Sequence, residues 1–176
     1  MAPSQRESRC ILFDWGDTLM RVFPDYDGPM AAWPRVEAMP HAVDVLTELH
    51  KEFLLGVATN AADSDEAEIR AALARVGLDP LLDRIYCHRS LGHKKPSQEY
   101  FEAVLADLGL EPDRVVMVGD DFAADVVGAN RSGIRAIWYN PYTSEEREND
   151  TYQTVHDLGR LLHVATIRDL IDERTS

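Results

Sequence analysis

The sequence predicts an α/β fold, a three-layer, Rossmann-like parallel sheet with helices on both faces. Short apolar runs alternate with longer segments whose apolar residues recur at helical spacing. The longer segments begin or end at Pro, Gly, Ser or Asp, which are the usual residues at helix boundaries. The length of 176 residues is enough for a five- or six-stranded sheet, so we expect residues 1–176 to form a single domain.

The predicted strands are short, unbroken apolar runs, as expected for strands that are covered on both faces. They lie at 10–13, 53–58, 85–87, 115–118 and 134–138, and residues 154–162 add an edge strand and a turn. The alternation of such runs with helices favours parallel pairing, because parallel strands need long crossover connections.

Two helices are expected in the first half of the chain. Pro40 opens the first helix, where a missing N–H is tolerated. The residues predicted for its apolar face are Val43, Leu46 and Leu49. Asp63 or Ser64 caps the second helix, which ends at Gly77.

Three further helices follow in the second half. Pro96 and Ser97 begin a helix that ends near Gly109. The segment 122–132 is a helix rich in small residues, stopped by Gly133, and 167–173 forms the last helix.

Composition disfavours several classes of partner and site. The chain has 18 Lys plus Arg against 31 Asp plus Glu, a formal charge of -13, which disfavours nucleic acid and anionic membranes as partners. No apolar run approaches the length of a membrane span, and residues 1–9 lack the apolar core of a signal peptide, so we expect a cytoplasmic protein without a membrane partner. Cys10 and Cys87 lie in apolar runs without metal-ligand spacing, which favours buried thiols in a reducing compartment.

Asp14 is the first candidate for chemistry. It follows the first strand in the run Asp14-Trp15-Gly16-Asp17-Thr18-Leu19. Open parallel sheets bind ligands at the carboxyl ends of their strands, although an acidic residue at such a place can also cap a turn.

Two positions in the middle of the chain suit phosphate binding. Thr59 follows the second strand, and its hydroxyl and the backbone N–H of Asn60 can donate to a phosphoryl oxygen without adding charge. Lys95 precedes Pro96 and a helix, where a cation offsets phosphate charge; it is chosen over Lys94 because it directly precedes the proline. The alternatives are a helix-capping threonine and a surface lysine.

The run Val118-Gly119-Asp120-Asp121-Phe122-Ala123-Ala124-Asp125 places carboxylates at a strand-to-helix turn. Magnesium prefers oxygen ligands and keeps several waters, so few carboxylates suffice to bind it. The alternative is a helix N-terminus that is merely rich in Asp.

Together these motifs resemble those of the haloacid dehalogenase-like hydrolase superfamily, which consists mostly of magnesium-dependent phosphatases. The first motif of the superfamily reads D-x-D-G-T, and Asp14, Thr18 and Leu19 fit it. Gly16 stands where the general acid and base is expected, and Asp17 stands where the family has glycine. The resemblance covers about residues 10–140.

The resemblance implies an activity and a role for each site residue. It implies a Mg²⁺-dependent phosphatase that acts through an aspartyl-phosphate on Asp14. Thr59, Asn60 and Lys95 would hold the phosphoryl group, and Asp17 is a candidate acid. Asp14, the carbonyl of Gly16 and Asp120 would bind the metal, with Asp125 holding a metal water or Lys95.

The chain departs from the family in two respects. It has room for a short flap at about 20–39 and for no cap domain. Capless relatives act on large substrates or close the site with a neighbouring subunit, so we expect a phosphorylated small molecule or macromolecule as partner, or a homo-oligomer. The aromatic residues Trp15, Phe23, Tyr26 and Trp33 would stack on a substrate, form an oligomer contact or pack the flap onto the sheet.

The second departure is the missing acid, which leaves three alternatives. Asp17 takes over the role, the substrates have good leaving groups, or the protein is a weak or inactive module that binds a phosphorylated ligand. His88 and His93 flank the Lys95 loop and are expected to be exposed.

Overall fold

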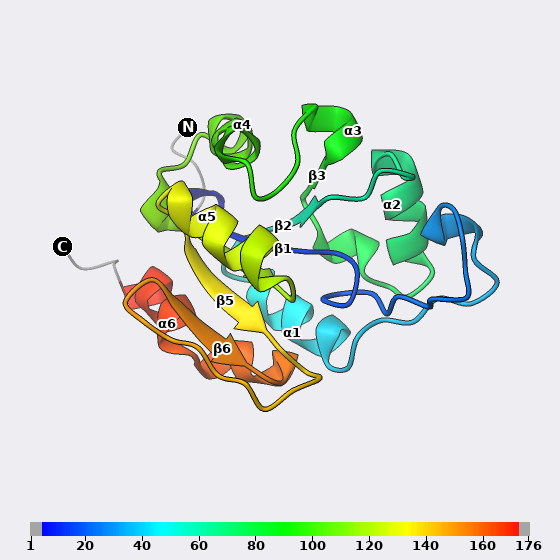
Figure 1. Ribbon diagram of the computed structural model, residues 1–176. Coiled ribbons are helices and arrows are strands. Elements are labelled where there is room, and N and C mark those ends of the chain that lie inside the picture. The colour runs from blue at the N-terminus through cyan, green and yellow to red at the C-terminus, as the bar shows by residue number, and fades with distance from the viewer. Residues whose placement is uncertain (1–4, 173–176) are drawn as a thin grey trace.

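The computed structural model describes residues 5–172. Its centre is a six-stranded sheet of order β3-β2-β1-β4-β5-β6, in which all neighbouring strands run parallel (Figure 1). The strands are β1 (Cys10–Phe13), β2 (Leu54–Thr59), β3 (Arg84–Cys87), β4 (Val115–Gly119), β5 (Arg135–Tyr139) and β6 (Tyr152–Val155). The predicted parallel α/β sheet is therefore confirmed.

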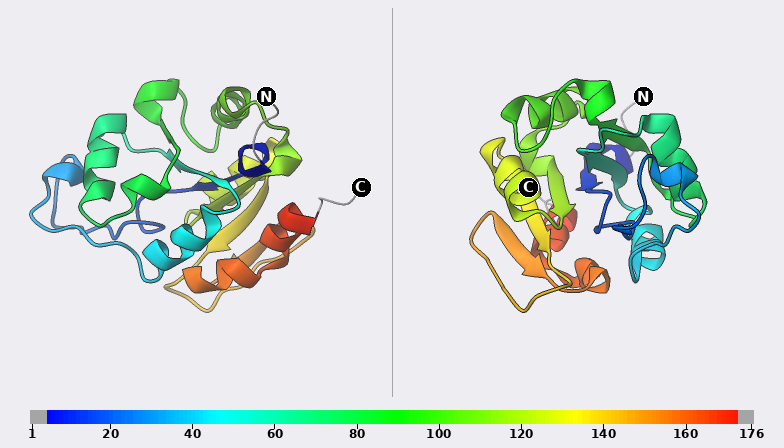
Figure 2. Two further views of the ribbon diagram at one scale, coloured as in Figure 1. Left: turned by 180° about the vertical axis from the view of Figure 1, so that it is seen from behind. Right: turned by 45° about the vertical axis from the view of Figure 1, so that its right-hand side comes forward.

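Helices cover both faces of this sheet, as Figure 2 shows from two further directions. The α-helices are α1 (Ala42–Leu49), α2 (Glu66–Ala74), α3 (His88–Leu91), α4 (Gln98–Leu108), α5 (Gly128–Arg131) and α6 (Ala165–Asp172). The π-helix η5 (Phe122–Val127) precedes α5. The 3₁₀ segments are η1 (Gln5–Ser8), η2 (Met30–Ala32), η3 (Asp79–Leu81), η4 (Pro112–Arg114) and η6 (Leu158–His163).

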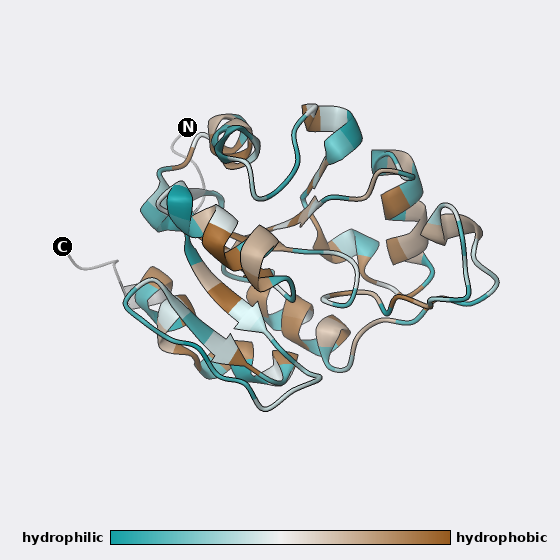
Figure 3. Cartoon of the chain, viewed as in Figure 1, coloured by the Kyte–Doolittle hydropathy of each residue, from teal (hydrophilic) through white to brown (hydrophobic). Residues whose placement is uncertain are grey.

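The side chains of the strands alternate between two separate cores. Ile11 and Phe13 pack with α1, α2, η6 and α6 on one face, and Cys10 and Leu12 pack with α4, η5 and α5 on the other. Figure 3 shows hydrophobic colours on the elements beside the sheet and hydrophilic colours on many outer loops. Cys10 and Cys87 are buried free thiols, as expected.

Two details of the predicted helices are wrong. Val43 is exposed, and the inward face of α1 is formed by Ala42, Val45, Leu46 and Leu49, because these four residues recur at the i, i+3, i+4 and i+7 spacing of one helical face. The cap of α2 is Asp65, not Asp63 or Ser64, because Asp65 accepts from the N–H of Glu68 while the Glu68 side chain accepts from the N–H of Asp65.

The other differences from the predicted elements are smaller. The one-turn helix α3 was not predicted, and the predicted helix at 122–132 is divided into η5 and α5. The predicted edge strand and turn appear as β6 and η6. The last helix runs to Asp172, and the remainder of its predicted range lies outside the described residues.

The flap predicted at about 20–39 lies against the body of the protein. It contains η2 and an isolated antiparallel bridge between Met20 and Ala38. Trp15 and Trp33 are buried, and Phe23 and Tyr26 pack beside them, with ring centroids of Tyr26 and Trp33 5.5 Å apart. Of the three alternatives for these aromatic residues, the structure shows packing of the flap onto the core.

Candidate active site

The parallel register brings the predicted site residues to one edge of the sheet. Asp14 directly follows β1, between Thr59 at the end of β2 and Asp120 directly after β4. The N–H of Asp14 donates to the carbonyl of Val118 (2.8 Å), which fixes its backbone to β4. The site therefore follows from strand order, because residues distant in sequence end their strands side by side.

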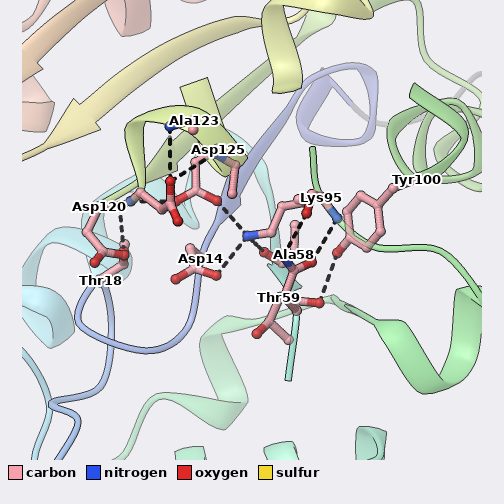
Figure 4. Close-up of polar contacts among 12 residues, drawn as sticks. Asp14, Thr18, Ala58, Thr59, Lys95, Tyr100, Asp120, Ala123 and Asp125 are labelled. Atoms are coloured by element: carbon pink, nitrogen blue, oxygen red, sulfur yellow. Dashed lines mark hydrogen bonds and ion pairs between the residues drawn. The ribbon is translucent and has the colours of Figure 1, made fainter. Parts of the chain in front are cut away.

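Lys95 connects the carboxylates of this edge (Figure 4). Its Nζ donates to Asp14 Oδ1 (2.8 Å), Asp125 Oδ1 (2.6 Å) and the carbonyl of Ala58 (2.6 Å), so all three ammonium protons have partners. Burial alone would lower the pKa of Lys95, but the two carboxylates overcome this effect and raise its pKa above its usual range. Lys95 is therefore a buried cation, whereas Lys94 is exposed.

The side chain of Asn60 holds the lysine loop, a role that no local pattern in the sequence indicates. Its side-chain Nδ2 donates to the carbonyl of Lys95 (2.9 Å), and its Oδ1 accepts from the N–H of Lys95 (2.8 Å). The Asn60 amide thus pairs with both backbone groups of Lys95 and leaves its own backbone N–H for the predicted phosphate contact.

Thr59 is buried beside this pair, and its hydroxyl oxygen accepts from the N–H of Ala61 (3.1 Å). Helix α2 begins seven residues further on, at Glu66, after its own cap Asp65. Thr59 is therefore not the capping residue of that helix, which was the alternative interpretation of this position.

Three carboxylates meet next to Lys95. Asp14, Asp120 and Asp125 each offer an oxygen within 4.8 Å of the others. Burial and the charge of Asp14 raise the pKa of Asp120 to about 7. Burial also raises the pKa of Asp125 to about 7, although Lys95 acts in the opposite direction. Repulsion between the buried Asp125 and the half-buried Asp14 and Asp120 is what a bound cation relieves, so the donor set fits a hard divalent ion.

The neighbours of the three carboxylates differ. Asp125 accepts from Lys95 through Oδ1 and from the N–H of Asp121 through Oδ2 (3.0 Å), so neither oxygen is free of a protein donor. Asp120 accepts through Oδ1 from the hydroxyl of the buried Thr18 (3.1 Å). Asp120 is therefore better suited than Asp125 to bind a metal directly.

Gly119 makes this arrangement possible. A Cβ atom at Gly119 would lie 2.1 Å from Asp125 Oδ2, which is a severe overlap. The backbone carbonyl of Asp120 accepts from the indole of Trp138 (2.8 Å), which ties the turn to β5. Neither Trp138 nor Thr18 was among the predicted site residues, since their contacts depend on strand order.

The site opens into a hollow of about 200 Å³. It is lined by Asp14, Asn60, Lys95, Asp120, Asp121, Ala124 and Asp125. Most of the predicted site residues thus share one cavity, whereas His88 and His93 do not line it. The ring of His88 instead contacts the carbonyl of His93 (3.1 Å).

Gly16 and Asp17 lie in the turn between Asp14 and the flap, outside the set that lines the hollow. Asp17 has a positive φ of 54°, and its Oδ1 accepts from the N–H of Val22 (3.1 Å) and the hydroxyl of Tyr142 (3.2 Å). Tyr142 follows β5, a neighbour of Asp17 that the sequence gives no reason to expect.

Comparison with known proteins defines the class. A model of the haloacid dehalogenase-like hydrolase family matches residues 16–133, more than half of the chain. The protein therefore belongs to the haloacid dehalogenase-like hydrolases.

Named relatives include several phosphatases. The chain is 27% identical over 133 residues to glyceraldehyde 3-phosphate phosphatase of Methanothermobacter thermautotrophicus, covering 75% of this chain and 58% of that protein. It is 32% identical over 111 residues to ribulose-1,5-bisphosphate 5-phosphatase of Halopiger xanaduensis, covering 62% and 44%. The chain thus spans about half the length of these relatives.

Solved structures agree on the fold. An uncharacterized protein from Listeria monocytogenes serotype 4b superposes with a TM-score of 0.77 at 29% identity, covering 93% of this chain and 97% of that one. The HAD-hydrolase YfnB from Bacillus subtilis, in a structure bound to magnesium, has a TM-score of 0.71 at 18% identity, covering 89% and 97%. Within residues 5–172, no helix has the length and apolar character needed to cross a membrane.

Proposed function

We propose that this hydrolase is a Mg²⁺-dependent phosphatase that transfers a phosphoryl group to Asp14 and then releases it to water. The observation that carries the proposal is the buried Lys95 cation, which bonds both Asp14 and Asp125 at the wall of an acidic hollow. The phosphatases among the relatives support the reaction class.

Asp14 is the nucleophile in this proposal. Its carboxylate attacks phosphorus, and the resulting aspartyl-phosphate divides one difficult displacement into two easier steps. Lys95 holds Asp14 in place by its 2.8 Å contact and supplies positive charge beside the transferring group. Thr59 and the backbone N–H of Asn60 are the proposed neutral donors to the phosphoryl oxygens.

The proposed metal ligands are Asp14, the Gly16 carbonyl and Asp120, with Asp125 in a supporting position. When bound, Mg²⁺ supplies charge neutralisation between the carboxylates and the phosphoryl oxygens. Thr18 orients Asp120 through the hydrogen bond from its hydroxyl, and Lys95 holds Asp125. A phosphorylated small molecule or macromolecule remains the proposed substrate class.

A second candidate function is a module that binds a phosphorylated ligand with little or no turnover. It is favoured by the position of Asp17, the candidate acid. The Asp17 carboxylate accepts hydrogen bonds from the N–H of Val22 and the hydroxyl of Tyr142, and it does not line the hollow. In this candidate the Lys95 and Asp120 groups bind phosphate and metal, but the chemistry stops there.

The test is Mg²⁺-dependent hydrolysis of a small aryl phosphate by the parent and by Asp14→Asn. We expect activity in the parent and a fall to the uncatalysed rate in the variant, since Asn cannot form the intermediate. Asp150→Asn, in the exposed loop after β5, is the matched control and should keep the parent rate. Equal activity in the Asp14 variant and the parent would contradict the proposal.

A parent without activity would favour the binding module. In that case, isothermal titration with Mg²⁺ and inorganic phosphate decides between the candidates. Binding to the parent that Lys95→Met abolishes supports the module, and absence of binding excludes both functions.

A further inference from the structure

The side chains that line the hollow are already engaged around the nucleophile. Lys95 donates its three protons to Asp14, Asp125 and Ala58. The amide of Asn60 is paired with the backbone of Lys95. All three protons of the Lys95 ammonium are thus in use, and the remaining N–H of the Asn60 amide is not acidic enough to protonate a leaving group.

The remaining carboxylates of the hollow are not free to give a proton to a leaving group. Asp125 accepts on both oxygens, from Lys95 and from the N–H of Asp121. Asp120 accepts from the hydroxyl of Thr18 and is a proposed metal ligand, so its carboxylate acts as an acceptor as well. Asp121 caps η5 by accepting from the N–H groups of Ala123 and Ala124.

The turn after Asp14 does not offer a proton donor either. Gly16 has no side chain, and a Cβ atom there would lie 2.9 Å from Cγ2 of Val22. The Asp17 carboxylate accepts from the N–H of Val22 and from the Tyr142 hydroxyl, so the proton of that hydroxyl is already donated to Asp17. Across residues 5–172, no side chain that lines the hollow is thus placed to protonate a leaving group.

From this arrangement we infer that the substrate is a mixed anhydride of phosphate, such as an acyl phosphate, whose leaving group departs without a proton. The inference rests on the proposed function and specifies its substrate class. A carboxylate is a weak base and needs no general acid, whereas an alkoxide does. The geometry therefore favours acyl phosphates over phosphate esters of simple alcohols.

The balanced reaction has two steps. The Asp14 oxygen forms a bond to phosphorus while the bond from phosphorus to the acyl oxygen breaks, and the carboxylate leaves with that electron pair. Water then attacks the aspartyl-phosphate, giving free Asp14 and inorganic phosphate, and its proton passes to solvent. Since no lining side chain is placed to activate that water, we expect the second step to be slow and the first to give a burst of carboxylate.

The first test compares kcat/KM of the parent, with Mg²⁺, for acetyl phosphate and propyl phosphate. General acid assistance is worth about a hundred- to ten-thousand-fold, so its lack predicts a preference of at least about a hundred-fold for acetyl phosphate. A smaller preference overturns the inference. If that happens while Asp14→Asn still abolishes activity, the proposed function stands and only the substrate class fails.

The second test adds the missing group. Gly16→Asp combined with Val22→Ala, which removes the overlapping methyl, should hydrolyse propyl phosphate at least about ten-fold faster than the matched Gly16→Asn and Val22→Ala protein. The burst phase on acetyl phosphate, which reports the first step alone, should differ less than about three-fold between the two variants. Equal rates on propyl phosphate would overturn the claim that a missing proton donor limits the reaction. If either double variant fails to fold, the comparison of substrates with the parent decides.

Discussion

Replacement of Lys95 by Met tests the centre of the site with a matched control next to it in the sequence. The Lys95 side chain is 2% exposed and makes three contacts of 2.6 to 2.8 Å. Lys95→Met keeps much of the side-chain volume but removes the cation. It leaves Asp125, whose side chain is 1% exposed, without its ion-pair partner.

Breaking a buried ion pair by removal of one partner destabilises a protein by about 3–5 kcal/mol. The lost hydrogen bond to the Ala58 carbonyl acts in the same direction, whereas proton uptake by a carboxylate partly offsets the loss. We therefore expect Lys95→Met to lower the free energy of unfolding by about 3 kcal/mol or more. Lys94→Met changes an exposed lysine and should stay within about 0.5 kcal/mol of the parent.

The assay is urea unfolding at neutral pH without added metal, followed by circular dichroism. It reports stability independently of any activity, so the result does not depend on the proposed function. A Lys95→Met protein that unfolds within about 1 kcal/mol of the parent would refute the reasoning, because the ammonium would then not stabilise the network.

Three other perturbations have defined outcomes. Gly119→Ala places a Cβ atom 2.1 Å from Asp125, so we expect a loss of about 2 kcal/mol or more in urea unfolding, and a loss below about 0.5 kcal/mol would show that the turn adapts. Burial opposes ionisation of Asp83, but a backbone N–H of β2 and the Arg6 guanidinium together lower the pKa of its carboxyl. The stability that ionised Asp83 contributes is therefore present above the unfolded-state pKa of about 4 and is lost as pH falls. Asp83→Asn should flatten the decline of the free energy of unfolding at acid pH, and an unchanged decline would exclude Asp83 as its cause. Protons compete with Mg²⁺ for Asp120, whose pKa is raised to about 7. Mg²⁺ should therefore raise the unfolding temperature more at about pH 8 than at about pH 6, and an equal rise at both pH values would contradict this prediction.

The sheet could be predicted because strands that are buried on both faces appear in the sequence as unbroken apolar runs. The run Cys10–Phe13 is buried at all four positions, so an unbroken apolar sequence was sufficient. The buried face of α1 is harder to predict from the sequence. Ala42 belongs to the core although its side chain is small, whereas the larger Val43 next to it suggests a different face. The cap of α2 could have been identified from the spacing of Asp65 and Glu68.

Contacts between distant residues explain what the sequence did not predict in the site. The Thr18 hydroxyl meets Asp120 across 102 positions, and Tyr142 meets Asp17 across 125. Such pairs depend on which strands become neighbours, and no local pattern indicates them. The same limit applies to Asn60, whose side chain pairs with a backbone 35 residues away.

The most direct test of the account is to detect the phosphoryl group on Asp14. The parent is mixed with acetyl phosphate and Mg²⁺, quenched in acid within the first turnover, and analysed by peptide mass spectrometry. The account predicts one added phosphoryl group on the peptide that contains Asp14, and none in Asp14→Asn. Turnover of substrate with that peptide unmodified, or with the phosphoryl group on another residue, would contradict the account.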